Sequence, residues 1–321
     1  MNTNTEQSAI AHYDVAVIGG GAAGLSAAIA LARSRRSVLV VDAGEPRNAP
    51  AAGAHNVLGH DGVPPLELLA AGRKEAVGYG VEIRVDTAAA VRRDGDAFEV
   101  DLEESGTVRA RRLVLASGLV DELPELPGVR EMWGKKVLHC PYCHGWEVRD
   151  QRIGVIGSSP MSVHQALLFR QLTDDVTLFT HTMPELDADS VEQLAARQIR
   201  VVDVAVVRLR DEGDKGVTVV LDGAPDAEQD AVVVAPRFHA RADLYRQLGG
   251  TMTDHPLGAF IDSDPMGKTE VPGVWAAGNA SDLSAMVMVA SGAGVMAGAA
   301  VNADLVAEDV ASAVRDRTAQ R

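Results

Sequence analysis

Short apolar runs along the chain alternate with stretches of helical pattern. Residues 13–18, YDVAVI, form a continuous apolar run that predicts a buried strand, and residues 37–41, SVLVV, predict a second one. Between them a glycine-rich turn at 19–24 leads into a helical stretch that ends near Ser34. The pattern therefore predicts a strand–turn–helix–strand unit near the start of the chain.

A second unit of this kind follows later in the chain. Residues 152–156 predict a strand that ends at Gly157, a helix follows, and residues 175–180 predict the next strand. Further strands are predicted at 81–84, 98–102, 107–111, 113–116, 201–207, 216–221 and 231–235, and a segment at 271–278 and a small-residue helix after Leu283 complete the fold. Alternating strands and helices predict the α/β class, with the two units forming a loose internal repeat.

The first glycine turn has the residues that a dinucleotide site needs. Gly19 suits the tight turn, Gly21 lets the backbone approach a pyrophosphate, and Gly24 lets the helix pack closely on the strand. The helix N-terminus stabilises phosphate charge. Asp42 ends the second strand 18 positions after Gly24, where a carboxylate accepts hydrogen bonds from a ribose hydroxyl. These features together predict a dinucleotide site, whereas the glycine motif alone would be weak evidence.

Composition narrows the class of protein. The 321 residues are 46% hydrophobic and 23% charged, which is ordinary for a globular protein with room for two domains. A formal charge of −15 argues against nucleic acid and anionic membranes as partners. Residues 15–32 and 283–301 are apolar, but their Gly, Ala and Ser content favours close-packed helices over membrane spans. The N-terminal segment 1–14 has no basic or apolar region of a secretion signal, so we expect a short polar arm and a cytoplasmic protein.

The two cysteines of the chain, Cys140 and Cys143, are separated by only Pro141 and Tyr142. Thiols at this spacing near a helix N-terminus form a redox-active pair, because that setting favours the thiolate. His139 and His144 flank the pair and leave a Cys/His metal site as the alternative, although a structural zinc site needs four suitably placed ligands. We therefore expect a redox dithiol and no bound metal.

The order of these motifs resembles the low-molecular-weight thioredoxin reductase family. The resemblance rests on the first glycine turn, LASG at 115–118, the C-x-x-C with a second Rossmann-like unit after it, and PGVWAAGN at 272–279. It implies two Rossmann-like three-layer domains and a homodimer. Residues 1–119 and 243–321 would form a discontinuous FAD-binding domain. Residues 120–242 would form an inserted nicotinamide-domain-like part that carries the C-x-x-C.

The resemblance also suggests which residues contact FAD. These are Gly19, Gly21, Ala22, Ala23, Gly24, Asp42, Ala43, Arg47, Asn48, Ser117, Gly118, Gly278, Asn279, Met286 and Val287. Asn279 stands where the family usually has an aspartate. Asn48 and Asn56 lie in a loop that runs near the flavin in this fold, and stabilisation of the loop itself is an equally good interpretation of both.

The string CPYCHGWE at 140–147 is more similar to the dithiol oxidase branch, whose gliotoxin, holomycin and romidepsin enzymes form disulfides in small molecules. That likeness implies a dithiol substrate, FAD, and O2 as the electron acceptor. Cys140 would exchange with the substrate and Cys143 would face the flavin. His144 replaces the aspartate of the reductases, and a histidine that titrates near neutrality suits a base. A capping histidine is the alternative, and His139 is a weaker candidate for the base.

Two departures from the reductase pattern fall in the second unit. The turn reads Gly157-Ser158-Ser159-Pro160 and keeps only its first glycine. The strand after it ends in THTMPE, without the arginines that would bind a 2′-phosphate. We therefore expect NADPH binding to be lost, although serines at the turn can still donate hydrogen bonds. A thioredoxin reductase-like enzyme that uses NADPH or ferredoxin, and an FAD-bound redox sensor or scaffold, are the alternative functions.

Overall fold

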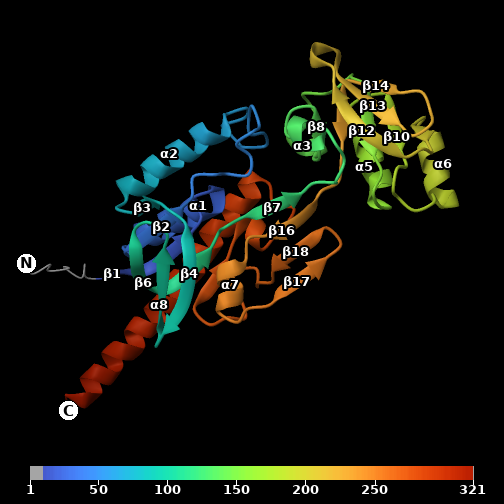
Figure 1. The fold of residues 1–321 in the computed structure, drawn as a ribbon. Coiled ribbons are helices and arrows are strands. Elements are labelled where there is room, and N and C mark those ends of the chain that lie inside the picture. The colour runs from blue at the N-terminus through green and yellow to red at the C-terminus, as the bar shows by residue number, and fades with distance from the viewer. Residues whose placement is uncertain (1–9, 321) are drawn as a thin grey trace, which may run out of the picture. The chain divides into compact units, whose positions relative to one another are not determined.

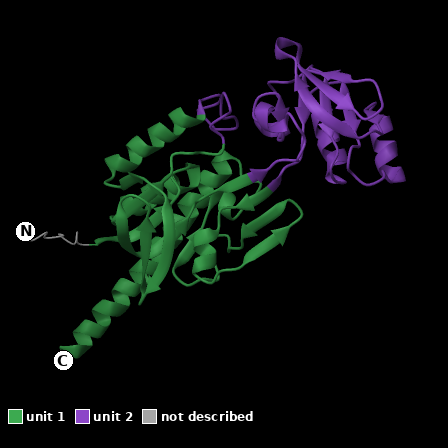
Figure 2. Cartoon of the chain, viewed as in Figure 1, with its two compact units in different colours: residues 1–47, 65–120, 238–321 green, residues 48–64, 121–237 purple. Residues whose placement is uncertain are grey.

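The computed structural model describes residues 10–320, so most of the predicted polar arm lies outside the described residues. Contacts divide the chain into two compact units (Figure 2). Unit 1 comprises residues 1–47, 65–120 and 238–321, and unit 2 comprises residues 48–64 and 121–237. Each unit therefore combines segments that are distant in sequence.

Unit 1 is built on a seven-stranded sheet of order β3-β2-β1-β6-β5-β4, with β19 paired to β6 (Figure 1). Its strands are β1 (Ala11–Ile18), β2 (Val38–Asp42), β3 (Glu82–Val85), β4 (Ala88–Asp94), β5 (Ala97–Leu102), β6 (Gly106–Leu115) and β19 (Val274–Ala276). β1 runs parallel to both β2 and β6, as expected for buried strands rich in Val and Ile. The carboxyl ends of β1 and β2 therefore lie side by side, which brings Gly19 and Asp42 together.

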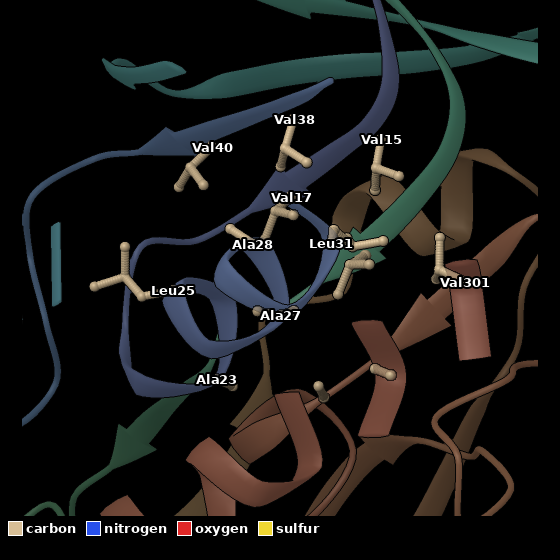
Figure 3. Packing of buried hydrophobic residues seen from close by; sticks show 14 of the residues in the cluster. Val15, Val17, Ala23, Leu25, Ala27, Ala28, Leu31, Val38, Val40 and Val301 are labelled. Carbon is tan, nitrogen blue, oxygen red and sulfur yellow. The ribbon is translucent and has the colours of Figure 1, made fainter. Parts of the chain in front are cut away.

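One face of this sheet is covered by α1 (Ala22–Arg33), with α8 (Val287–Ala319) packed against α1. Figure 3 shows Leu25, Ala28 and Leu31 of α1 close to valines of β1 and β2. Small residues allow the two helices to approach closely. A Cβ atom on Gly294 would lie 2.0 Å from the carbonyl oxygen of Ala23, and one on Gly298 would lie 2.8 Å from that of Ala27.

The apolar helix α8 is the one described helix that is long and apolar enough to cross a membrane. A third of its most apolar stretch is nevertheless buried in the fold. The expectation of close packing in the small-residue stretch is confirmed by the contacts of Gly294 and Gly298 with α1. The other apolar stretch, 15–32, consists of the end of β1, the glycine turn and most of α1.

The remaining elements of unit 1 lie beside this core. They are α2 (Pro65–Gly78), α7 (Asp243–Gln247), the 3₁₀ turn η2 (Gly278–Ala280), and β17 (Met252–His255) and β18 (Gly258–Ile261). The last two strands join a four-stranded sheet of order β17-β18-β16-β7. The other two strands of that sheet are β16 (Arg237–Ala240) and β7 (Leu119–Glu122), at which the chain passes from one unit to the other.

Unit 2 contains a five-stranded sheet of order β11-β10-β9-β15-β8. Its strands are β8 (Val137–Leu138), β9 (Ile153–Ile156), β10 (Val176–Phe179), β11 (Arg200–Val202) and β15 (Ala231–Val233). A three-stranded sheet consists of β12 (Val206–Asp211), β13 (Val217–Leu221) and β14 (Ala227–Gln229). The helices are α3 (Val129–Met132), α4 (Pro141–His144), α5 (Met161–Phe169) and α6 (Ala188–Ala196), and a 3₁₀ turn η1 spans Gly213–Lys215.

The α/β class is confirmed, but two strand predictions were wrong in their limits. The strands predicted at 107–111 and 113–116 form one continuous strand, β6. Arg112 lies within it because its guanidinium pairs with Asp304 (2.6 Å) and Glu308 of α8. The single strand predicted at 201–207 is divided at Asp203 into β11 and β12, which belong to different sheets.

Candidate active site

The first glycine turn, in unit 1, is tightly packed at two of its three predicted glycines. Gly19 has a positive φ of 107°, and a Cβ atom there would lie 2.3 Å from the carbonyl oxygen of Ala116. A Cβ atom on Gly24 would lie 1.8 Å from the carbonyl oxygen of Gly19. Both glycines are therefore required by the turn and by the contact between helix and strand.

Gly21 differs from these two because a Cβ atom there would meet nothing within 4 Å. The residue is the N-cap of α1, and it has an extended backbone and no side-chain cap. No acidic residue lies in the first turn of the helix. An uncapped helix N-terminus beside open space fits the pyrophosphate of a dinucleotide, since the helix dipole and the backbone N–H groups favour an anion there.

Asp42 lies at the end of β2 and faces the turn. Its Oδ1 accepts a hydrogen bond of 3.0 Å from the N–H of Gly20, and its Oδ2 pairs with Arg73 of α2. A carboxylate has about four acceptor positions, so a ribose hydroxyl can still donate to it. The neighbouring Ala43 is exposed just beyond the strand.

The remaining predicted FAD contacts of unit 1 have structural partners of their own. Ser117 donates its hydroxyl to the carbonyl of Arg241 at 2.6 Å. Gly118, with φ of 72°, accepts from the N–H of Arg241 at 2.9 Å. Arg47 stacks its guanidinium on Phe238, 5.1 Å from the ring centroid.

Asn279 lies in η2 and anchors the loop between η2 and α8. Its Nδ2 donates to the carbonyls of Asp282 and Ala285, both at 3.0 Å. An aspartate could not make these two bonds, because it has no donor. Met286 is the N-cap of α8 and Val287 is its first residue. Gly278 lies against α1, where a Cβ atom would be 2.8 Å from that of Ala23.

The dithiol lies in unit 2, after β8. Cys140 is the N-cap of α4, Pro141 is its first residue, and Cys143 lies within its single turn. The two sulfur atoms are 2.7 Å apart, and both side chains are half-buried. Gly145 ends the turn in a tight contact, since a Cβ atom there would lie 2.4 Å from a methyl carbon of Leu172. The structure therefore holds the two thiols within direct exchange distance.

His144 is the last residue of α4. Burial lowers the pKa of its imidazole, with a smaller raising effect from the Glu147 carboxylate and a lowering one from His55. Its Nε2 atom is buried and has no hydrogen-bond partner among residues 10–320. Such an imidazole is neutral at pH 7 and can accept a proton.

His139 immediately follows β8. Its backbone carbonyl accepts a hydrogen bond of 3.0 Å from Nε2 of Gln165 on α5. Between residues 10 and 320, no group of three or more His, Cys, Asp or Glu side chains is arranged to hold a metal ion.

The sequence alone did not show that the 48–64 loop contacts the helical turn at 140–145 that carries the two cysteines. Asn56 donates its Nδ2 to the carbonyl of Tyr142 at 2.8 Å, and Nε2 of His55 lies 3.3 Å from a carboxylate oxygen of Glu147. Asn48 begins this loop, and its carbonyl accepts from the N–H of Ala51 at 3.0 Å. The signal available in the sequence was the pair of polar residues His55-Asn56, but nothing in the pattern indicated their partners.

The second glycine turn, at the end of β9, uses its backbone groups internally. Gly157 donates to the carbonyl of Phe179 at 2.7 Å and accepts from Thr182 at 3.2 Å. The N–H of Ser158 donates to the buried hydroxyl of Ser162 at 3.2 Å. A Cβ atom on Gly157 would lie 2.7 Å from the sulfur of Met183, so this side chain fills the space beside the turn.

His181 follows β10, where nucleotide-binding units of this type hold the ribose. Its Nδ1 accepts a hydrogen bond of 3.0 Å from the N–H of Val206, and burial lowers the pKa of the ring. The imidazole is therefore neutral and offers no cation to a phosphate. The segment 171–196 around it has no Lys or Arg and six Asp or Glu residues.

Known proteins share this architecture over most of the chain. Residues 13–296 match the family described as pyridine nucleotide-disulphide oxidoreductase. A thioredoxin reductase named tcpT, from Claviceps purpurea (strain 20.1), is 32% identical over 306 residues, which cover 92% of this chain and 95% of the relative.

Two solved structures are also similar. The crystal structure of HlmI has a TM-score of 0.88 and 48% identity, and the match covers 95% of this chain and 96% of HlmI. An oxidoreductase from Agrobacterium tumefaciens has a TM-score of 0.87 and 37% identity over 92% of this chain and 99% of its own. The chain therefore belongs to the pyridine nucleotide-disulphide oxidoreductase family and is a thioredoxin reductase-like, FAD-dependent disulfide oxidoreductase.

Proposed function

We propose that this protein is a dithiol oxidase, which forms an intramolecular disulfide in a small-molecule dithiol of natural-product type and uses O2 as the acceptor, giving H2O2. The observation that carries the proposal is the second glycine turn. The N–H of Ser158 bonds to the hydroxyl of Ser162, and the side chain of Met183 fills the space beside Gly157. A nicotinamide nucleotide would have to displace these contacts without a nearby cation to attract its phosphates.

The chemistry of the proposal starts from the oxidised pair. A substrate thiolate attacks the sulfur of Cys140, which breaks the Cys140–Cys143 disulfide and releases Cys143 as a thiolate. The second substrate thiolate then attacks the substrate sulfur of the mixed disulfide, so that the product leaves as a disulfide and Cys140 becomes a thiolate. When bound, FAD supplies the two-electron acceptor for this thiol pair, and O2 with two protons takes up those electrons as H2O2.

The residues of unit 2 support this direction of electron flow. Oxidation of a dithiol requires removal of two protons from the substrate, and His144 is a neutral imidazole next to the pair. We assign the base role to His144 and not to His139, whose backbone lies before the turn at the end of β8.

We place FAD binding in unit 1. The FAD-binding domain of residues 1–119 and 243–321 would hold the pyrophosphate at Gly21 and the ribose at Asp42, with the inserted part at 120–242 presenting the dithiol. We also propose a cytoplasmic location, because a lone C-x-x-C in a cytoplasmic protein is typically catalytic. A homodimer is proposed from the family resemblance alone.

Oxygen uptake with a panel of small dithiols, run with and without NADPH and thioredoxin, tests the proposal. We expect O2 consumption with a suitable dithiol alone, one H2O2 for each disulfide formed, and no stimulation by NADPH. A requirement for NADPH, or rapid bleaching of the flavin by NADPH or NADH in a stopped-flow experiment, contradicts it.

The second candidate is a disulfide reductase, which is favoured by the similarity to the thioredoxin reductase tcpT. If this reductase took its electrons from ferredoxin in place of NADPH, it would need no nucleotide site. Reduction of thioredoxin by reduced ferredoxin, with no dithiol-dependent O2 uptake, would support this candidate. A redox sensor is distinguished by the absence of turnover with any dithiol.

A further inference from the structure

Two large aromatic side chains beside the dithiol are exposed. Tyr142, between the two cysteines, is 63% exposed, and Trp146, three residues after Cys143, is 66% exposed. Of the three tryptophans in the chain, Trp275 is buried and Trp133 is half-buried, so Trp146 is the one that the fold leaves exposed. A single exposed aromatic residue is ordinary on a protein surface, but two of them next to a reactive thiol pair indicate a surface that another molecule covers.

Helical geometry places Trp146 next to both Cys143 and Tyr142. The backbone stays helical through Gly145, whose φ is −68° and ψ is −33°. On a helix, residues three and four apart are neighbours, with about 5–6 Å between their Cβ atoms. Trp146 is three residues after Cys143 and four after Tyr142. The two aromatic side chains therefore share one side of the turn with the thiol of Cys143.

The indole of Trp146 is held in place by Arg149. The guanidinium lies over the ring, 4.2 Å from its centroid, and Nη1 donates to the backbone carbonyl of Trp146 at 2.7 Å. A cation stacked on one face of an indole is an attractive contact, and here it restricts the orientation of the ring. The opposite face is left as a flat apolar surface.

The backbone on both sides of the indole is anchored within unit 2. Before it, the carbonyl of Tyr142 accepts from Nδ2 of Asn56 at 2.8 Å. After it, Val148 is buried in a core cluster, and the N–H of Asp150 donates to the carbonyl of Leu172 at 3.0 Å. The fold thus exposes the ring while it fixes the chain that carries the ring. A preorganised binding surface has these two properties, because it loses little entropy when a ligand binds.

We propose that Trp146 is a specificity-determining residue, and that the substrate carries its two thiols on a flat apolar ring that stacks on the open face of the indole. The inference rests on the proposed function, in which a substrate thiolate attacks Cys140. The sulfur atoms of Cys140 and Cys143 are 2.7 Å apart, so a substrate bonded to the first also lies beside the second and hence beside the indole. A polar, flexible dithiol would bury less apolar area there.

Anaerobic flavin reduction by two dithiols tests the inference on the FAD-loaded protein. The compound ortho-bis(mercaptomethyl)benzene carries its thiols on a flat apolar ring, whereas dithiothreitol is flexible and polar, and both close a ring of the same size when they are oxidised. We expect the unmodified protein to prefer the aromatic dithiol. The preference, taken as the ratio of the two values of kcat/KM, should fall by about tenfold or more in Trp146→Leu.

The loss should appear as a higher dithiol concentration at the half-maximal rate of flavin reduction. The limiting rate with the aromatic dithiol should change less, because stacking stabilises the bound substrate before and during thiol exchange alike. Trp146→Phe keeps an aromatic plane and should retain most of the preference.

Tyr79→Leu is the matched control. Tyr79 is also exposed and also lies under a guanidinium, that of Arg33 at 5.0 Å, but it belongs to unit 1. This variant should leave the preference unchanged. Flavin absorbance and the thermal unfolding midpoint identify any variant that fails to fold, and Trp146→Gln replaces Trp146→Leu in that case.

The outcomes separate this inference from the proposed function. No flavin reduction by either dithiol in the unmodified protein would overturn the dithiol oxidase itself. Reduction by both dithiols without a preference, with a preference that Trp146→Leu retains, or with equal slowing of both in that variant, would overturn only the role of Trp146. Loss of thioredoxin reduction in Trp146→Leu, with the preference between small dithiols intact, would also overturn it and assign the ring to a protein partner.

Discussion

The sulfur atoms of Cys140 and Cys143 lie 2.7 Å apart in a single turn of helix that begins at Cys140 itself. The pair is in unit 2, whereas the glycine turn that fits FAD is in unit 1. Loss of one thiol should therefore abolish the reaction without affecting cofactor binding.

We predict that Cys143→Ser keeps its flavin absorbance but loses dithiol-dependent O2 uptake by at least ~10³-fold, as expected for loss of a covalent catalyst. Cys140→Ser should behave in the same way in the uptake assay. Single-turnover mixing with a dithiol under anaerobic conditions is the direct measurement. Substantial flavin reduction in Cys143→Ser would sink the scheme of thiol exchange.

Two glycines of the first turn should respond differently to alanine. In Gly24→Ala, the new methyl group would meet the carbonyl oxygen of Gly19 at 1.8 Å, so we expect a loss of about 3 kcal/mol or more in the free energy of unfolding. In Gly21→Ala, the methyl group enters open space, and the backbone with φ of −79° accepts an alanine. Gly21→Ala should fold normally and bind FAD more weakly.

Chemical denaturation of the apoproteins and FAD titration separate these two effects. Equal stability of the two variants would contradict the packing argument. Unchanged FAD affinity in Gly21→Ala would contradict the pyrophosphate position.

Asn279→Asp should destabilise the loop before α8. The substitution removes the donor to the carbonyls of Asp282 and Ala285 and places a negative charge beside both oxygens. We expect a cost of about 1–2 kcal/mol, measured as a lower thermal unfolding midpoint. Asn302→Asp is the matched control, because Oδ1 of Asn302 accepts from Arg36 at 2.9 Å and a carboxylate keeps that bond. A control as unstable as the test variant would refute the explanation.

The free energy of unfolding should fall below neutral pH, and His181 should account for part of this decrease. Burial holds the pKa of His181 below its ordinary value of 6.5, so below that pH the unfolded chain binds a proton that the folded chain does not. The free energy of unfolding therefore decreases as the pH falls below about 6.5. Protonation would also remove the bond that Nδ1 accepts from Val206.

His181→Asn should reduce this pH dependence, since asparagine tolerates the positive φ of 48° and can accept from the same N–H. Urea unfolding at pH 7 and pH 5 gives the comparison. An unchanged difference between the two pH values in His181→Asn would show that other groups determine it.

The sequence predicted the first half of unit 1 well because its signals are local. β1, the glycine turn and α1 each have a strong apolar or glycine pattern, and Asp42 ends its strand as expected. α2 was missed because only three of its residues, Pro65, Leu69 and Ala76, are buried, which leaves little apolar periodicity. β6 was divided in two because Arg112 has the polarity of a strand end, and its ion partners lie about 200 positions away on α8.

In the candidate site too, residues with a local sequence signal could be predicted, and contacts between distant segments could not. The dithiol, its flanking histidines and the glycine turns could be named from spacing alone, whereas their roles remain predictions. Contacts between distant segments, such as Asn56 with Tyr142 and His55 with Glu147, have no periodic or spacing signal. Asn279 was expected near FAD, and its bonds to Asp282 and Ala285 add a structural reason for the amide.

The membership of residues 48–64 in unit 2 also has a consequence for building chimeras. An exchange of residues 121–237 between two homologues would transplant the cysteines but leave Asn56 and His55 of the recipient against a foreign turn. Unit 2 is therefore encoded by two separate stretches of the gene, and both must be exchanged together. Junctions placed only near residues 120 and 237 would leave residues 48–64 of the same folded unit behind.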